Sequence, residues 1–575
     1  MDEELTIGRG DAVYLAHAYL TKVPVSAIIP FIERYTEQGD TVLDPFAGSG
    51  MTGVAAMTLN RNAALSDVSA LGRHIGSNYC SLVDPKTLCQ ARELVIDRAK
   101  ARIGDIYVVG SDMDPVIGGT AKLVKTVWSS VYQCRRCDKR VNYYHAFKNA
   151  NWVKAAMQCP SCGTQINARL AKIAEEPVVD YLESARWKSQ QEFAPVEKLD
   201  VLDPHEYGLQ EPSLSIPEDR EMAKASALRH NGRLTVKSFY SPRNWLALCA
   251  LHHEISQIEN DAVRKKLLFA FTAILTRASK RYQWSPKRPL NAANQNYYVA
   301  PVFYEWNVFD LFVRKVQAAI RSDAWIVENN RAYLGLQQMG KVSYQKQSAV
   351  SLSIPDSSVD YIFTDPPFGS NLFYSDMALF QEVWLDEFTD ETQEAVVDRS
   401  SGGARSAERY ELMITQALTE CRRVLKRNGR ISFVFGNSTG TMWALIQRAI
   451  SNAGLSIVPS EIVILNKGQR SVKGLASGFE HVATLDLILT LVPDEDDRHG
   501  VIVPFADDIE NTIDSILTNL SGRSVNHVYL EVLRIGIRNR WDLSNIDLRF
   551  VAKRLSETGW GVDSVTGVLK SPSGL

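Results

Sequence analysis

The chain contains two widely separated segments with one pattern: a short apolar strand, then a polar turn, then a helix. In the first, the apolar run Thr41–Leu43 leads into the glycine-rich turn 44–50 and a helical pattern. In the second, the apolar run 359–364 opens onto Asp-Pro-Pro-Phe, and an amphipathic helix that we expect to end at Gly429 follows. Alternating strands and helices form parallel sheets, which must be covered on both faces. Neither segment can do this alone, so we predict an α/β protein in which both join one doubly wound sheet.

This requirement divides the chain into four parts. We expect residues 1–85 to form the first half of the sheet domain, 86–335 an insertion, 336–492 the second half, and 493–575 an acidic connector with a small helical C-terminal domain. Within the insertion, residues 205–330 have mostly helical periodicity. The insertion is therefore predicted to have a first part that carries two CxxC pairs and a mostly helical second part.

Composition limits the class of protein. The 575 residues are 45% hydrophobic and 23% charged, which excludes a disordered chain, a collagen and a coiled coil. Lysine and arginine number 64 against 66 acidic residues, so any surface for nucleic acid must be local. The N-terminus lacks the pattern of a signal peptide, and no apolar run is long enough to cross a membrane. We therefore expect a cytoplasmic protein without a membrane partner.

The glycine-rich turn can bring a ligand close to the backbone. Gly48 and Gly50 allow the amides of the turn and the N-terminus of the following helix to approach a bound group. Asp67 ends the next predicted strand, where a carboxylate can bind ribose hydroxyls. The alternative is a strand-to-helix turn that uses glycine only for its shape.

The Asp-Pro-Pro-Phe turn predicts recognition of an amino group on a ring. Its two prolines remove two backbone donors and stiffen the chain, so Asp365 and the Pro366 carbonyl remain as acceptors beside the ring of Phe368. The acceptors suit the hydrogens of an exocyclic amino group, and the ring suits stacking on a base. The alternative is a turn that only ends the strand.

Two CxxC pairs in the insertion predict a structural zinc site. Cys134 and Cys137, followed by Cys159 and Cys162, have the spacing of a four-thiolate zinc ribbon, which we place within residues 130–170. Four thiolates leave no coordination position for water, so the metal would stabilise the fold. The alternatives are cysteines paired by coincidence and a ribbon whose basic, aromatic surface contacts nucleic acid.

Basic and aromatic residues form two further candidate nucleic-acid contacts. The first lies within residues 277–288 of the insertion and the second in a turn after residue 467. The candidates are Arg277, Lys280, Arg281, Trp284, Lys287, Arg288, Arg470 and Lys473. Phosphate contact is one interpretation of this pattern. A solvated loop whose aromatic side chains enter the core is the other.

Three motifs together resemble those of the amino-methylating DNA methyltransferases. DPFAGSGMTG resembles their S-adenosylmethionine-binding motif, TDPPFGS their catalytic Asp-Pro-Pro-aromatic motif, and HAYLTKVP, which contains Lys22, the motif that precedes the glycine turn. The resemblance covers about residues 10–80 and 340–490. Two departures are Phe368 in place of the commoner tyrosine, and the absence of an acidic residue from the strand KVSYQKQSA.

The resemblance implies a Rossmann-like S-adenosylmethionine-dependent methyltransferase sheet of seven strands, interrupted by a zinc-ribbon and helical insert. It implies that the cofactor is bound by Lys22, Asp44, Phe46, Gly48, Gly50 and Asp67. It implies that Asp365, Pro366, Pro367 and Phe368 hold a base flipped out of duplex DNA. The amino nitrogen then attacks the methyl group directly, so catalysis consists of positioning and desolvation. Methylation of a cytosine ring carbon needs a Pro-Cys nucleophile, which this sequence lacks.

These implications predict a site-specific DNA methyltransferase that modifies adenine N6 in preference to cytosine N4. Such enzymes commonly serve restriction-modification or phage defence beside partner proteins. Two alternatives stay open: an RNA amino-methyltransferase, and a catalytically inactive protein of this fold that binds DNA. A small-molecule methyltransferase leaves the long insertion and its cysteines unexplained.

Overall fold

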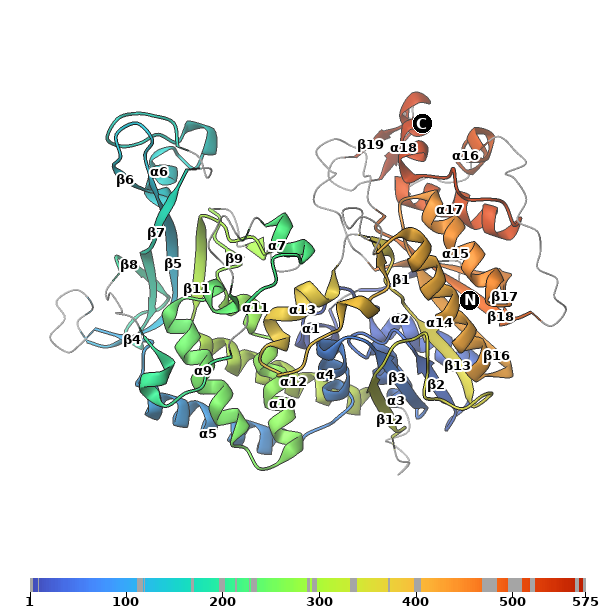
Figure 1. The fold of residues 1–575 in the computed structure, drawn as a ribbon, viewed down its shortest axis with the longest axis horizontal. Coiled ribbons are helices and arrows are strands. Elements are labelled where there is room, and N and C mark those ends of the chain that lie inside the picture. Colours follow the sequence, from blue (N-terminus) through green and yellow to red (C-terminus); the bar gives the residue numbers. More distant parts are fainter. Residues whose placement is uncertain are drawn as a thin grey trace.

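The computed structural model describes residues 4–8, 10–110, 117, 119–166, 170–195, 202–212, 215–226, 228, 235–286, 290–291, 297–330, 339–370, 373–397, 405–467, 483–494, 509–517, 523–563 and 568–571. These residues form two eight-stranded sheets, which belong to different lobes (Figure 1). The α/β class is thereby confirmed. No helix within the described ranges combines the length and the apolar character needed to span a membrane.

The main sheet has the order β1-β17-β18-β16-β13-β2-β3-β12. Its strands are β1 (Glu4–Thr6), β2 (Thr41–Asp44), β3 (Asn62–Asp67), β12 (Val342–Lys346), β13 (Val359–Thr364), β16 (Leu425–Phe435), β17 (Leu455–Asn466) and β18 (Asp486–Pro493). All neighbouring strands are parallel except that β18 is antiparallel to both β16 and β17. Val42 of β2 pairs with Tyr361 of β13, so the two separated segments join one sheet as predicted.

Helices cover both faces of this sheet. They are α1 (Ala12–Ala16), α2 (Val25–Tyr35), α3 (Met51–Thr58), α4 (Ala70–Tyr79), α13 (Tyr374–Glu382), α14 (Ala407–Val424) and α15 (Gly440–Asn452). Side chains alternate along β13: Tyr361 and Phe363 enter the core beneath α2 and α3, whereas Ile362 enters the core beneath α14 and α15. The sheet is therefore apolar on both faces, as a buried parallel sheet must be.

The helix that we expected to end at Gly429 ends earlier. α14 stops at Val424, and the chain enters β16 at Leu425, which pairs with Val359 of β13. A register shift follows this pair before Tyr361 pairs with Arg430. Pairing with the neighbouring strand thus overrides the helical periodicity of residues 425–429.

The insertion contains more strand than the sequence predicted. Its elements are α5 (Pro85–Ile103), β4 (Val108–Val109), β5 (Ala121–Gln133), β6 (Arg140–Asn142), α6 (Tyr143–Asn149), β7 (Lys172–Glu183), β8 (Gln191–Phe193), α7 (Glu221–Ala225), α9 (Pro242–Ser256), α10 (Asp261–Thr272), α11 (Leu275–Ala278), β9 (Tyr282–Gln283), β10 (Leu290–Asn291), β11 (Val302–Trp306) and α12 (Val308–Asn329). The expected helices α9 to α12 are present, but β5 and β7 form the spine of a second, antiparallel sheet. Figure 1 shows these two strands rising to a tip that holds β6 and α6. Both strands lie before residues 205–330, the part of the insertion for which helical structure was predicted, and they were not predicted from the sequence because strands that pair at long range leave a weak periodic signal.

Three C-terminal helices pack on the second half of the main sheet. They are α16 (Ile509–Leu517), α17 (Val525–Arg538) and α18 (Leu548–Glu557), followed by the short strands β19 (Gly561–Val562) and β20 (Leu569–Lys570). Tyr529 and Leu533 of α17 are fully buried in the same hydrophobic cluster as Trp443 of α15 and Phe435 of β16. These helices thus share the core of the main sheet.

Candidate functional site

One cavity joins the glycine turn to the Asp-Pro-Pro-Phe turn. The empty space within it is about 960 Å³, including space open to solvent. It lies beyond the carboxyl ends of β2, β3 and β13, and its walls include Asp44, Gly48, Asp67, Asp365 and Pro367. Two motifs far apart in sequence therefore face one space, at the sheet edge where α/β proteins bind ligands.

The glycine turn adopts a conformation that favours glycine. Gly48 has φ +46° and Gly50, which precedes the first residue of α3, has φ +78°. A Cβ atom on Gly48 would lie 3.0 Å from the ring of Tyr19, and one on Gly50 would lie 2.6 Å from the Cα atom of Gly76 on α4. The turn is therefore packed closely against α4 and Tyr19, and neither position accommodates a side chain without movement.

Asp67 holds the glycine turn from the end of β3. Its Oδ2 accepts a hydrogen bond from the Gly48 amide at 2.8 Å, and its Oδ1 accepts one from the Ser69 amide at 2.8 Å. A carboxylate has about four acceptor positions, so two bonds leave capacity for hydroxyl groups in the cavity. The residue predicted to bind ribose thus also fixes the shape of the turn.

Asp44 and Lys22 line the cavity but are also bound within the protein. Asp44 accepts bonds from the Phe46 amide at 3.1 Å and from Thr52 at 2.6 Å, and burial raises the pKa of its carboxyl to about 7. The Nζ atom of Lys22 donates to the carbonyl of His17 at 2.5 Å, and burial lowers its pKa to about 7. Phe46 contributes a half-buried ring to the wall.

Asp365 presents an acceptor without a partner. Its Oδ1 atom is buried and has no hydrogen-bond partner among the described residues. Burial is the main reason that the pKa of this carboxyl rises to about 7. The positive charge of Lys467 opposes this rise, and the negative charge of Asp486 adds to it. A buried acceptor left unpaired is unfavourable by about 1–3 kcal/mol unless a ligand donor reaches it. Because Asp365 also lines the cavity, a ligand bound there can supply the missing donor.

Sequence reasoning missed the cation beside Asp365. Lys467 directly follows β17. It forms a 2.6 Å ion pair with Asp486 at the start of β18, and both side chains are buried. Burial opposes the positive charge of Lys467, but the negative charges of Asp486 and Asp365 outweigh this effect and raise the pKa of Lys467. Its position directly after a strand was the available signal in the sequence, but only the pairing of β17 with β18 brings Lys467 to Asp486 and close to Asp365.

Two donors hold the backbone of the Asp-Pro-Pro-Phe turn. The Tyr410 hydroxyl donates to the Pro367 carbonyl at 2.6 Å, and the Asn437 side-chain amide donates to the Phe368 carbonyl at 2.8 Å. The Phe368 ring meets Phe435 edge-on at a centroid distance of 5.3 Å. The turn is thus held at its backbone and at its ring.

Asn437 links this turn to the C-terminal helices. Its own carbonyl accepts from the indole of Trp443 at 3.0 Å and from the hydroxyl of Tyr529 on α17 at 3.1 Å. Asn437 is only 9% exposed, so these bonds are sheltered from water. The sequence analysis singled out neither Asn437 nor Tyr529, although a polar residue after a buried strand was a usable signal for the first.

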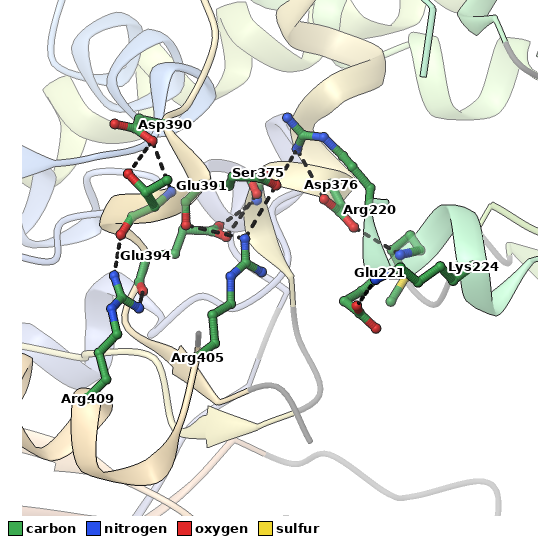
Figure 2. A network of polar contacts seen from close by, with 12 residues as sticks. Arg220, Glu221, Lys224, Ser375, Asp376, Asp390, Glu391, Glu394, Arg405 and Arg409 are labelled. Carbon is green, nitrogen blue, oxygen red and sulfur yellow. Dashed lines mark hydrogen bonds and ion pairs between the residues drawn. The ribbon is translucent and has the colours of Figure 1, made fainter. Parts of the chain in front are cut away.

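A polar network forms a further wall of the cavity (Figure 2). Glu394 lines the cavity and accepts from both the amide (2.6 Å) and the hydroxyl (2.8 Å) of Ser375 at the start of α13; burial raises its pKa to about 7. Arg220 of the insertion reaches Asp376 at 3.1 Å and Glu391 at 3.6 Å. The insertion is therefore tied by ion pairs to the segment that walls the cavity.

The four predicted zinc ligands lie together at the tip of the β5–β7 spine. All four Sγ atoms lie within 4.8 Å of one another, with Cys134 and Cys162 at 3.6 Å and Cys137 and Cys159 at 3.7 Å. None forms a disulfide. Tetrahedral coordination with Zn–S bonds of about 2.3 Å requires sulfur separations of about 3.8 Å. The cluster is therefore compatible with a zinc ion.

The predicted basic patch does not form a single surface. Arg281 is only 2% exposed and packs over Phe380, so it lies inside the protein rather than facing a phosphate. Lys280 pairs with Glu175 at 2.8 Å, and Trp284 packs against Tyr144. Arg277 is half-buried and has no recorded ion pair among the described residues. Four further candidates, Lys287, Arg288, Arg470 and Lys473, lie outside the described residues.

An open, largely parallel sheet with a cavity at the carboxyl ends of its strands is typical of nucleotide-binding α/β proteins. Residues 6–85 match the model of a family described as DNA methylase, whose members modify N6 or N4 amino groups. The match supports membership of the amino-methylating DNA methyltransferases and confirms the resemblance seen in the sequence. No curated protein matches the chain significantly.

We predict that Gly48→Val weakens S-adenosylmethionine binding roughly 5- to 30-fold. The left-handed backbone disfavours an L side chain by about 1–2 kcal/mol, and the new Cβ meets Tyr19 at 3.0 Å. Calorimetric titration measures the affinity. Gly561→Val is the matched control, because nothing lies within 4 Å of a Cβ atom there. Equal affinities would argue against this turn as the binding wall.

Replacing Cys134 with serine is expected to release about one zinc ion per chain and to unfold the tip of the insertion. Zinc content and hydrogen exchange of residues 134–166 measure the two effects. Cys89→Ser, on α5 and outside the cluster, is the control and should retain the metal. A metal-free wild-type protein with a protected tip would contradict the zinc assignment.

Asn437→Asp is expected to lower kcat roughly 5- to 100-fold while leaving cofactor affinity unchanged. The substitution keeps the shape but removes the amide donor, which leaves the Phe368 carbonyl unpaired at a penalty of about 1–3 kcal/mol. Single-turnover methylation and calorimetry separate the two quantities. Asn452→Asp, exposed at the end of α15, is the control; an equal loss in both variants would rule out this role.

Proposed function

We propose that this protein transfers a methyl group from S-adenosylmethionine to an exocyclic amino group of a DNA base, adenine N6 in preference to cytosine N4. The observation that carries the proposal is the cavity shared by the glycine turn and Asp365, whose Oδ1 acceptor has no partner among the described residues. The family match over residues 6–85 supports DNA amino-methylation in general. The preference for adenine rests on the Asp-led turn alone.

The order of the main sheet supports a Rossmann-like methyltransferase domain. β2 and β13 are neighbours near the middle of the sheet. On the β2 side the strand order continues with β3 and β12, and on the β13 side it continues with β16, β18 and β17, of which β18 is antiparallel to its neighbours. The expected seven strands are accompanied by an eighth, β1, which pairs with β17 at the edge. The candidate cavity lies where these two sides of the sheet diverge, which is the ligand position in doubly wound sheets.

The residues of the first half fit a nucleoside cofactor. The amides and glycines of residues 44–50 offer close backbone approach, Asp67 retains acceptor capacity for ribose hydroxyls, and Phe46 offers an apolar surface. Lys22 and Asp44 hold the surrounding backbone in place. When bound there, S-adenosylmethionine supplies an electrophilic methyl group on a sulfonium sulfur.

The residues of the second half fit an amino group on a base flipped out of the duplex. We assign acceptance of its hydrogens to Asp365 Oδ1 and the Pro366 carbonyl, which the rigid Pro366-Pro367 pair keeps in place. We assign stacking on the base to the Phe368 ring, which in this structure packs edge-on against Phe435. This arrangement points the nitrogen lone pair away from the acceptors. Catalysis therefore consists of positioning the amino nitrogen and excluding water.

The remaining parts suit an enzyme that acts on DNA. We assign the cysteine cluster to a structural zinc ion that stabilises the tip of the insertion, and the insertion to target recognition. A role in restriction-modification or phage defence, in the cytoplasm and beside partner proteins, is consistent with this chemistry.

The direct test supplies the purified protein with tritiated S-adenosylmethionine and, separately, duplex DNA, single-stranded DNA and RNA. Tritium on duplex DNA, identified as N6-methyladenine after the DNA is digested to nucleosides, would support the proposal. N4-methylcytosine would show that the enzyme modifies cytosine instead of adenine. Label on RNA alone would favour the RNA enzyme, and cofactor binding without label on any substrate would favour the inactive DNA-binding protein.

We predict that Asp365→Ala abolishes methyl transfer while cofactor affinity stays within about twofold of the wild type, because the carboxyl acts on the base rather than on the cofactor. Methyl incorporation and calorimetric titration are the two measurements. Asp97→Ala, which removes an exposed carboxyl on α5, is the control and should keep full activity. An active Asp365→Ala enzyme would refute the assignment.

A further inference from the structure

Three cations surround one indole ring in the insertion. The Nζ atom of Lys125 on β5 lies 4.9 Å from the ring centroid of Trp306, which ends β11. The guanidinium of Arg277 on α11 lies 4.2 Å from the same centroid, and that of Arg314 on α12 lies 5.9 Å from it. Three positive charges from three different elements therefore converge; we name Lys125, Arg277 and Arg314 the Trp306 cation cluster.

Aromatic rings form the floor of this cluster. Trp306 is 8% exposed and Tyr304 is 6% exposed, so their rings are buried beneath the cations. Lys125 also lies 4.2 Å from the centroid of Tyr181, while the Arg314 side chain is exposed. Rings attract cations, but they are neutral and do not cancel the net charge.

No carboxylate pairs with the cluster in the described part of the chain. Asp310, one turn before Arg314 on α12, is instead paired with Lys122 at 3.1 Å. Glu192 is the acidic side chain that favours the charge of Lys125, whereas burial and the charges of Arg277 and Arg314 lower its pKa.

The lack of compensation distinguishes the cluster from neighbouring cations. Lys122, on the same strand as Lys125, pairs with both Glu183 (3.0 Å) and Asp310, and Lys280, close to Arg277 in sequence, pairs with Glu175. The Nε atom of Arg277 is buried without a hydrogen-bond partner among the described residues. Like charges held together in this way are unfavourable unless an anion joins them.

The helix that carries Arg314 also contacts the segment that leads to the candidate cavity. Next to Arg314 on α12, Lys315 donates to the carbonyls of Leu15 (3.2 Å) and Ala16 (2.8 Å) at the end of α1. A few residues further along the chain, the cavity is lined by Tyr19, Thr21, Lys22 and Val23. Figure 1 shows α11 and α12 beside α1 and α13, and contacts between these elements agree.

We propose that the Trp306 cation cluster binds backbone phosphates of the DNA substrate. Guanidinium groups match phosphate oxygens in geometry, and the cluster supplies two of them together with one ammonium. The inference rests on the proposed function for the identity of the polymer, but the anion site itself rests on the uncompensated charges. It adds Lys125 and Arg314, which no sequence motif indicated, to the nucleic-acid surface.

The test compares two double variants that remove the same charge. Lys125→Gln with Arg314→Gln removes two cations of the cluster; Lys122→Gln with Lys265→Gln removes two cations already paired with carboxylates. Affinity for a labelled DNA duplex is measured by anisotropy between about 50 and 200 mM salt. The cluster variant should bind about tenfold or more weakly and lose up to about two units of salt slope, since each phosphate contact contributes about 0.9. The control should match the wild type.

Four outcomes decide the proposal. Equal affinity and slope in the cluster variant and the control would overturn it. Loss of RNA binding with DNA binding intact, or competition by inorganic phosphate alone with an unchanged DNA slope, would overturn the DNA assignment. If circular dichroism shows that the double variant does not fold, the single variant Arg314→Gln, at an exposed position, replaces it. That variant should lose about one unit of the salt slope of DNA binding. Weakened DNA binding in the variant of a protein that transfers no methyl group would support the cluster while refuting the proposed enzyme.

Discussion

The parallel pairing of β2 with β13 is the constraint on which the site depends. Val42 lies opposite Tyr361 and Leu43 opposite Ile362, although the insertion separates the two strands in sequence. Because neighbouring parallel strands end at the same edge of a sheet, this register brings Asp44 and Asp365 to one cavity. A shift of one residue would reverse the alternation of side chains between the two cores and is therefore disfavoured.

The cavity carries several buried carboxyl groups. Burial raises the pKa values of Asp44, Asp365 and Glu394 to about 7, which reflects the free energy needed to keep these groups out of water. Asp44 and Glu394 are satisfied by hydrogen bonds within the protein, whereas Asp365 Oδ1 is not. Lys467 partly offsets the charge of Asp365. The group with unmet hydrogen-bonding capacity is thus the one that a substrate is expected to reach.

Much of the site was predictable because its motifs are local. A glycine turn after a strand, an Asp-Pro-Pro-Phe turn and two CxxC pairs each occupy a few consecutive residues, whose backbone chemistry limits their use. The long strands β5 and β7 were not predicted. They pair with each other although they are distant in sequence, and buried and exposed side chains do not alternate regularly along them. Charge in sequence was also a poor guide to exposure, since Arg281 is buried against Phe380.

The sequence by itself determined the α/β class, the acidic and glycine residues at the ends of two strands, and the four thiolates. The reason is that strand periodicity, turn chemistry and ligand spacing act over short stretches of chain. Only the tertiary structure decided that Asn437 and Tyr529 support the Asp-Pro-Pro-Phe turn, that Lys467 accompanies Asp365, and that three cations meet at Trp306. These contacts join residues far apart in the chain, and side-chain packing between whole elements creates them.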